Sequence, residues 1–293
     1  MERITGSIVA LVTPFTETGD VNYKVLGELI DFHLENKTDA ILVLGTTSES
    51  PTMSHAEDLH ICEFAVDRIA GRVPVIASSG SNSTQTMIEK SMDLQRAGAD
   101  ALLVISPYYN KANKEGMYHH FADVADVTDI PHILYNVPGR TGCEIPIDVV
   151  ERLSKHPNII GIKEASGNMS YATKVARFCN EDFAMYSGND DIIVPILSVG
   201  GSGVISVLAN IMPAETHDMV MNYLNGNTQA ALDEQLRLLP LINNLFCEVN
   251  PIPVKEAMNL MGMNVGGFRL PLYNAAPESI EKIKASMKEA GLL

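Results

Sequence analysis

The amino-acid sequence predicts a (β/α)8 barrel, and three observations lead to this prediction. Eight short apolar runs recur along the first 210 residues, and helical patterns follow most of them. The runs are almost continuously apolar, which is typical of parallel strands that are covered on both faces. No G-x-G-x-x-G segment follows the first run, where an open doubly wound sheet would place a dinucleotide site.

Small or polar residues end each predicted strand. The eight strands are predicted over residues 6–15, 40–45, 73–80, 101–107, 132–138, 159–166, 183–189 and 203–210. Helical periodicity predicts helices over residues 21–37, 54–70, 83–97, 147–155 and 169–179. Ser54 and Glu57 have the spacing of a capping box, and Gly71 and Gly98 stop the helices that precede them.

Beyond residue 210 the sequence holds only helical patterns, over residues 214–224, 228–246, 254–261 and 278–290. We interpret the first of these as the last helix of the barrel and the others as a helical region packed on it. The sequence therefore predicts a barrel over residues 1–226 and a C-terminal helical region over residues 227–293, with no linker between them.

The charge balance excludes several classes of partner. The formal net charge is -15 and the isoelectric point is near 4.9, whereas binding to a nucleic acid or an anionic membrane needs a concentrated positive field on the protein.

The four cysteines lie far apart, so neither a disulfide framework nor a zinc ribbon is expected. The chain starts without an apolar signal segment, and no apolar run reaches membrane length. We therefore expect a cytoplasmic protein with reduced thiols.

One lysine stands inside the sixth apolar run, which reads I-I-G-I-K-E-A-S-G-N over residues 159–168. Strand side chains alternate between faces, so Lys163 should share a face with Gly161, which leaves space beside the amine, while Ile160 faces the other way. Burial disfavours a charged ammonium, and a neutral amine attacks a carbonyl to give a Schiff base. A lysine here could instead reach into water or pair with a carboxylate.

The carboxyl ends of the strands build the active site of this fold, so residues at these ends are site candidates. The second run ends in G-T-T-S-E-S over residues 45–50, where backbone N–H groups after a glycine form a nest suited to a carboxylate. The same residues also fit an ordinary turn that caps the next helix. Both interpretations stay open at this point.

Aromatic and basic residues follow the fourth and fifth runs. Tyr108 and Tyr109 are adjacent, as is common at protein interfaces. The phenol of Tyr135 could relay protons to the lysine of the next strand, or it could be a core tyrosine with a backbone partner. Arg140 could hold a carboxylate in bidentate fashion, or it could lie at the surface of a glycine-containing turn.

No metal or nucleotide site is expected. Asp190 and Asp191 could suggest a cation, but they begin a helix, where acidic residues suit the helix dipole. The glycine-rich segment over residues 200–203 precedes a strand and does not open a helix, so it is in the wrong place for a phosphate cradle.

Six motifs, taken together and in order, resemble those of the dihydrodipicolinate synthase family, also called 4-hydroxy-tetrahydrodipicolinate synthases, over essentially the whole chain. They are G-T-T-S-E-S at 45–50, P-Y-Y-N at 107–110, Y-N-V-P-G-R-T-G at 135–142, G-I-K-E-A-S-G-N at 161–168, G-V-I-S-V at 203–207 and N-P-I-P-V-K at 250–255. The wider superfamily of pyruvate-dependent class I aldolases shares the lysine, the tyrosine and a similar threonine loop. The doubled threonine, the P-Y-Y-N pair and the arginine favour the synthases.

The resemblance implies a lyase that condenses pyruvate with L-aspartate 4-semialdehyde, giving 4-hydroxy-tetrahydrodipicolinate in the diaminopimelate route to lysine. Lys163 would form a covalent imine with pyruvate, so no cofactor or metal would be needed. Thr46 and Thr47 would hold the pyruvate carboxylate, while Gly188 and the backbone of Ile205 would line the same pocket.

The resemblance also implies roles at the mouth of the barrel. Tyr135 would relay protons in a hydrogen-bonded triad with Thr46 and Tyr109, and Tyr109 would come from a neighbouring subunit. Arg140 would steer the carboxylate of the aldehyde substrate and orient Tyr135. The implied assembly is a homotetramer, built as a dimer of dimers.

The resemblance also implies a regulatory site for lysine at the dimer interface, which this sequence matches only in part. The residues that match lysine-sensitive relatives are Ser50, His55, Asn82 and Tyr108. Asp58 and Thr86 stand where those relatives have a histidine and a glutamate. We therefore expect weak or absent inhibition by lysine.

Two other functions stay open as alternatives. An N-acetylneuraminate lyase or a 2-keto-3-deoxy sugar-acid aldolase of the same superfamily would share the lysine and the tyrosine. A barrel that binds a keto acid without catalysis should lose one of these two residues, and this chain keeps both.

Overall fold

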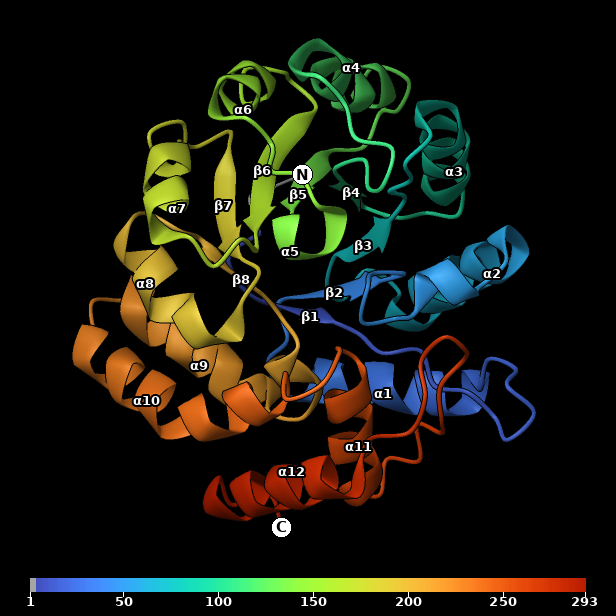
Figure 1. Cartoon of the computed structure of the whole chain (residues 1–293), viewed down its shortest axis with the longest axis vertical. Helices are drawn as coiled ribbons and strands as arrows, with labels where there is room; N and C mark the ends of the chain where they lie inside the picture. Colours follow the sequence, from blue (N-terminus) through green and yellow to red (C-terminus); the bar gives the residue numbers. More distant parts are fainter. Residues whose placement is uncertain (1–3) are drawn as a thin grey trace.

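The structure, a computed structural model, describes residues 4–293 and forms a closed barrel of eight parallel strands, which confirms the predicted fold class (Figure 1). The strands are β1 (Gly6–Ala10), β2 (Ala40–Val43), β3 (Val75–Ser78), β4 (Ala101–Ile105), β5 (His132–Asn136), β6 (Ile159–Glu164), β7 (Ala184–Ser187) and β8 (Gly203–Ser206). Strands that follow one another in sequence are neighbours, and β8 closes against β1. Residues 1–3, which the sequence analysis includes in the barrel, lie outside the described residues.

Helices surround the barrel (Figure 1). They are α1 (Tyr23–Glu35), α2 (His55–Ile69), α3 (Thr84–Arg96), α4 (Lys114–Ala125), α6 (Ile147–Leu153), α7 (Met169–Ala176), α8 (Ile193–Ser198) and α9 (Pro213–Leu224). Short helices follow several strand ends, namely η1 (Ser50–Thr52), α5 (Pro138–Thr141), η2 (Asp190–Ile192) and η3 (Leu208–Asn210). The sequence pattern defines no range for α4, α5 and α8, and the last two are too short for a periodic pattern.

The predicted strands extend beyond the observed ones at their carboxyl ends. The first prediction runs to residue 15, but β1 ends at Ala10, and the eighth runs to residue 210, but β8 ends at Ser206. The apolar pattern continues because Val12, Phe15 and Val207 are still buried after the strand ladder has ended. Residues just after the strand ends are buried at the mouth of the barrel. The apolar runs in the sequence are therefore longer than the strands.

Apolar side chains fill the inside of the barrel, and a second core lies between the strands and the helices. Ile8, Leu42 and Ile133 belong to the inner cluster. Tyr186 closes the amino-terminal end, where its hydroxyl donates a hydrogen bond to the carbonyl of Ile4 at 2.9 Å. Each buried aliphatic side chain of the inner cluster, such as Ile8 or Leu42, contributes about 1.5–3 kcal/mol to the free energy of folding.

The pairing of β5 with β6 contains one bulge. The register shifts between His132 and Ile133, where β6 carries one extra residue, Ile160. Strict alternation places Ile160 on the outer face, and this prediction is wrong because Ile160 packs against the inner cluster. Beyond the bulge the register is regular and pairs Tyr135 with Lys163.

Gly161 allows a close approach between β6 and β7. A Cβ atom at this position would lie 2.6 Å from the carbonyl oxygen of Ala184 and 3.3 Å from the ring of Tyr186. The atoms that exclude a side chain here therefore belong to β7. The predicted purpose, space beside the amine of Lys163, is not what the structure shows.

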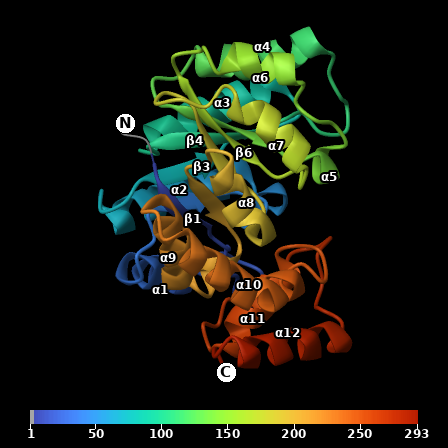
Figure 2. The ribbon, with the colours of Figure 1, turned by 90° about the vertical axis from the view of Figure 1, so that its left-hand side faces the viewer.

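The C-terminal region consists of α10 (Thr228–Asn244), α11 (Ile252–Leu260) and α12 (Pro277–Glu289). Figure 2 shows α11 and α12 at one end of the molecule, with α10 between them and the barrel. α10 packs against α9, and α12 packs against α10 and α11. The boundary between residues 226 and 227 stays a prediction. Among residues 4–293, no helix has the length and the apolar character that crossing a membrane requires.

His33 makes the stability of the barrel depend on pH. It is buried on α1, with Nδ1 2.9 Å from Oγ1 of Thr38, and its Nε2 has no hydrogen-bond partner within the described residues. Burial lowers the pKa of His33 to about 3. The unfolded chain binds this proton near pH 6.5, and the folded chain does so only near pH 3. Its contribution to stability is therefore complete above pH 6.5 and is lost as the pH falls toward 3.

We predict that His33→Gln reduces this pH dependence. Between about pH 6 and pH 5, the free energy of unfolding of the wild type should fall by about 1.4 kcal/mol per pH unit more than that of the variant. Urea denaturation at each pH measures both slopes, with His60→Gln as the control for loss of an exposed histidine. Parallel slopes for the wild type and His33→Gln would contradict the prediction.

Candidate active site

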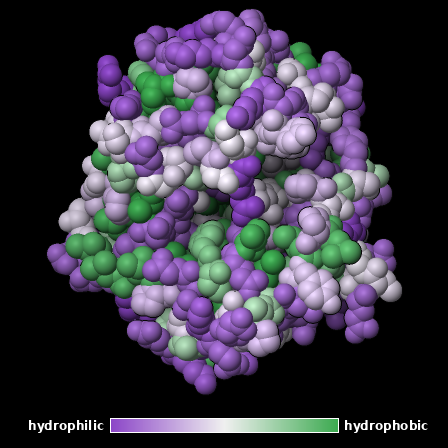
Figure 3. All heavy atoms as spheres, in the orientation of Figure 1, coloured by the Kyte–Doolittle hydropathy of each residue, from purple (hydrophilic) through white to green (hydrophobic). Residues whose placement is uncertain are grey.

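A cavity of about 470 Å³ opens at the carboxyl ends of the strands. The space-filling view in the orientation of Figure 1 is hollowed near its centre (Figure 3). Of the residues predicted for the site, those that line the cavity are Thr46, Thr47, Tyr135, Arg140, Lys163 and Gly188. Ile205 is buried in the inner cluster, and Val207 lines the cavity near the same strand end.

Lys163 is buried beside Tyr135. Its side chain projects from β6 into the cavity, the residue is only 6% exposed, and its amine lies 4.5 Å from the centre of the Tyr135 ring. Within residues 4–293 this amine donates no hydrogen bond and forms no ion pair. Neither of the ordinary roles considered for it, contact with bulk water or pairing with a carboxylate, therefore describes this lysine.

The turn after β2 leaves two backbone donors available. The N–H of Ser48 donates to the carbonyl of Gly45 at 3.1 Å, and the N–H of Glu49 donates to the carbonyl of Thr46 at 3.1 Å. The N–H groups of Thr46 and Thr47 donate to no group within the described residues, and both residues line the cavity. Two adjacent free donors of this kind suit a small carboxylate.

Asn250 also lines the cavity. It follows a helix, so the expectation that site residues lie at the ends of strands does not predict it. Its Nδ2 donates to Oγ1 of Thr47 at 3.0 Å, and its backbone carbonyl accepts from Nη2 of Arg140 at 3.2 Å. Its Oδ1 is buried without a partner in the described residues. The motif N-P-I-P-V-K at 250–255 marked this segment by resemblance, without assigning a role to Asn250.

Asp190 holds the end of β8. Its carboxylate accepts hydrogen bonds from Oγ of Ser206 at 2.6 Å and from the N–H groups of Val207 and Leu208 at 3.0 Å each. Asp190 begins η2, as predicted, but its carboxylate binds the start of η3. Burial raises the pKa of Asp190, and the hydrogen bonds from Ser206, Leu208 and Val207 oppose this shift. The described residues contain no group of three side chains placed to hold a metal ion.

Glu164 connects the loops that follow β5 and β6. Its carboxylate accepts from Nδ2 of Asn136 at 2.7 Å and from the N–H of Ser166 at 2.8 Å. Oδ1 of Asn136 in turn accepts from the N–H of Ile145 at 3.0 Å. Burial raises the pKa of Glu164, against the effect of these donors. The network fixes both ends of the loop that carries Arg140.

The triad predicted for Tyr135, Thr46 and Tyr109 is not formed within one chain. Tyr109 is 89% exposed and has a φ of 74°, in the left-handed region. No hydrogen bond joins any two of these three residues within the described part of the chain. A second cavity, of about 230 Å³, lies on another side of Tyr135 and is also lined by Thr46 and Tyr108.

An ion pair lies among the residues of the predicted regulatory site. The Nζ of Lys90 is 2.7 Å from Oδ2 of Asp58 and 3.3 Å from Oγ of Ser50. Burial raises the pKa of Asp58, and Lys90 opposes this shift. The ammonium group of Lys90 thus contacts two residues of the predicted regulatory site, Asp58 and Ser50.

The other residues predicted for the regulatory site also have partners within the chain. Nε2 of His55 lies 2.8 Å from Oδ2 of Asp93. Nδ2 of Asn82 donates to the carbonyl of Tyr108 at 3.2 Å. The hydroxyl of Thr86 donates to a neighbouring serine of its own helix cap, and not toward Lys90. Whether lysine binds here stays a prediction.

Comparisons with known proteins relate the whole chain to one family. The profile of the dihydrodipicolinate synthetase family matches residues 3–290. The chain is 54% identical over 292 residues to the 4-hydroxy-tetrahydrodipicolinate synthase of Caldicellulosiruptor saccharolyticus, covering 100% of this chain and 99% of the relative. The crystal structure of dihydrodipicolinate synthase from Aquifex aeolicus superposes with a TM-score of 0.96, at 44% identity over 98% of each chain. A structure described as a monomeric dihydrodipicolinate synthase variant superposes with a TM-score of 0.97, at 37% identity, covering 99% of this chain and 98% of that one. The chain belongs to the dihydrodipicolinate synthetase family.

Proposed function

We propose that this chain condenses pyruvate with L-aspartate 4-semialdehyde to give 4-hydroxy-tetrahydrodipicolinate, through a Schiff base on Lys163. The observation that carries the proposal is the buried amine of Lys163, which has no hydrogen-bond or ion-pair partner within the described residues. It lies in a cavity also lined by Thr46 and Thr47, whose backbone N–H groups donate to no described group. A 2-keto acid needs both features, a nucleophile for its carbonyl and donors for its carboxylate. Membership of the family and the names of the relatives support the same reaction.

In the proposed reaction the neutral amine attacks C2 of pyruvate, and loss of water leaves an iminium ion. The iminium withdraws electrons from the adjacent methyl group, which loses a proton and becomes the carbon of an enamine. This carbon attacks the aldehyde of the second substrate. The amine of that substrate then displaces Lys163, and the ring closes. Because the iminium itself stabilises the carbanion, the proposal includes no cofactor and no metal.

We assign the neighbouring residues by their position. We assign the proton relay to the hydroxyl of Tyr135, and the position of its ring beside the amine of Lys163 supports this assignment. Arg140 is exposed at the mouth and suits the carboxylate of the aldehyde substrate. Gly188 forms part of the wall, because a Cβ atom there would lie 2.5 Å from Cβ of Ala165.

We further propose a cytoplasmic homotetramer, a dimer of dimers, in which Tyr109 of one copy enters the second cavity beside Tyr135 of another. The exposure of Tyr109 and the cavity of about 230 Å³ lined by Thr46 and Tyr135 support this arrangement. It would complete the hydrogen-bonded triad that a single chain does not form. A monomeric variant exists among the relatives, so the assembly needs its own test.

The first prediction from the proposed function concerns the imine. Borohydride reduction in the presence of pyruvate should leave a reduced pyruvyl adduct on Lys163, and the adduct should be absent from Lys163→Ala. Mass spectrometry of peptides locates the adduct. Lys174→Ala, which removes an exposed lysine of α7, is the control and should be labelled like the wild type. An adduct on another lysine would contradict the mechanism.

The second prediction concerns Tyr109. Tyr109→Phe should lower kcat by about 100-fold or more, because it removes a proton relay. Borohydride should still trap pyruvate on Lys163 in this variant. Tyr273→Phe, another exposed tyrosine, should retain full activity.

Subunit mixing tests whether Tyr109 acts between copies. After exchange, Lys163→Ala and Tyr109→Phe chains form mixed dimers in which one site has both an intact lysine and an intact tyrosine. Activity should therefore rise above that of either variant alone. No recovery after demonstrated exchange would exclude a Tyr109 donated by a second copy.

The third prediction concerns regulation. Free L-lysine should inhibit weakly or not at all, because the amine of Lys90 already contacts Asp58 and Ser50. Steady-state assays with increasing L-lysine measure the effect. An inhibition constant below about 1 mM, corresponding to about -4.1 kcal/mol of binding free energy, would contradict the prediction.

A further inference from the structure

Lys255 is a second buried lysine, and all three of its donors have acceptors. Its Nζ donates to Oε1 of Glu49 at 2.8 Å, to the carbonyl of Thr13 at 3.1 Å and to the carbonyl of Gly267. The side chains of Lys255 and Glu49 are both 0% exposed. This ion pair connects α11 to the turn that follows β2.

Glu49 is the residue that ends this turn. Its φ is 60°, a left-handed conformation that non-glycine residues rarely adopt unless surrounding contacts maintain it. Its N–H closes the turn on the carbonyl of Thr46 at 3.1 Å, and its own carbonyl accepts from the hydroxyl of Thr52 at 2.8 Å. Its second carboxylate oxygen accepts from the N–H of Arg269 at 3.1 Å. With the bond from Lys255 and a bond from the N–H of Thr52 to the Glu49 carbonyl at 2.9 Å, five hydrogen bonds set the conformation of Glu49.

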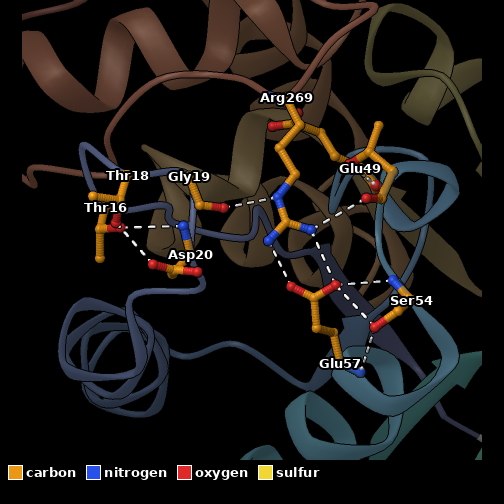
Figure 4. Close-up of polar contacts among 9 residues, drawn as sticks. Thr16, Thr18, Gly19, Asp20, Glu49, Ser54, Glu57 and Arg269 are labelled. Atoms are coloured by element: carbon orange, nitrogen blue, oxygen red, sulfur yellow. Dashed lines mark hydrogen bonds and ion pairs between the residues drawn. The ribbon is translucent and has the colours of Figure 1, made fainter.

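Arg269 adds a second connection between the C-terminal region and the mouth (Figure 4). Its guanidinium donates to the carbonyl of Gly19 at 2.8 Å and to the carbonyl of Thr52 at 3.1 Å. It also forms an ion pair with Glu57 at 2.5 Å, at the start of α2. The segment around Arg269 thus contacts the elements on both sides of the turn.

We propose that Glu49 and Lys255 are positioning residues for substrate binding, because their ion pair fixes the turn that contains the two free donors of Thr46 and Thr47. The two partners lie 206 positions apart in the sequence. The inference rests on the proposed function, which supplies the ligand, pyruvate. The pair has no net charge, so it acts on the geometry of the donors and not on the charge of the site. Loss of the pair should therefore weaken pyruvate binding more than it slows the later steps.

The test is the pyruvate concentration that gives half-maximal borohydride trapping of Lys163. Glu49→Gln and Lys255→Met each leave one buried charge unpaired, so both should lower Tm. The double variant removes both charges with little change in volume and should recover the part of the Tm that an unpaired charge costs, although the carbonyls of Thr13 and Gly267 still lose their donor. The half-saturating pyruvate concentration should nevertheless stay about tenfold or more above that of the wild type in all three, with a smaller effect on kcat.

The double variant separates positioning from stability. If it has the half-saturating pyruvate concentration of the wild type, the pair does not position the donors and the inference is overturned, whatever the Tm of the variant. If the wild type itself is not trapped by pyruvate, the proposed function fails, which is a different result from a trapped wild type with unchanged variants.

A milder variant covers the case in which the buried substitutions prevent folding. Arg269→Ala removes the second connection at a partly exposed side chain, and it should raise the half-saturating pyruvate concentration about threefold or more. Arg237→Ala is the matched control, because Arg237 forms its ion pair with Glu234 within α10. Equal values for Arg269→Ala, Arg237→Ala and the wild type would overturn the inference.

Discussion

The pairing of β5 with β6 is the constraint on which the site depends. One extra residue at Ile160 sets the register that brings Lys163 beside Tyr135, inside the barrel. Side chains in a strand alternate between faces, so a slip of one residue would turn Lys163 outward and Glu164 inward. The cavity would then contain a carboxylate in place of an amine. The closed sheet prevents such a slip, because every strand is paired on both sides.

Two buried lysines of the same barrel have opposite surroundings. Lys255 has an acceptor for every donor, and although burial lowers its pKa, the charge of Glu49 opposes this shift. Lys163 has no such acceptor within the described residues. Burial alone therefore does not distinguish them. The difference lies in whether the fold supplies partners, since an ammonium that the fold has already satisfied gains nothing from a substrate.

The sequence predicts the barrel and six residues of the cavity lining, because strand ends are visible as the ends of apolar runs. Thr46, Lys163 and Arg140 could be found in this way. Asn250 and Lys255 could not, because their partners lie about 200 positions away and follow no local period. The inward turn of Ile160 was missed for a related reason, since a bulge breaks the alternation on which the prediction rests.

The contact between Glu49 and Lys255 also has a consequence for the time course of folding. A ribosome produces the turn after β2 early and the segment around Lys255 and Arg269 much later, and contacts across such long separations form slowly. A nascent chain with all eight strands already made would still lack the residues that fasten this turn. The conformation of Glu49 is therefore set only after the segment that carries Lys255 and Arg269 has been synthesised.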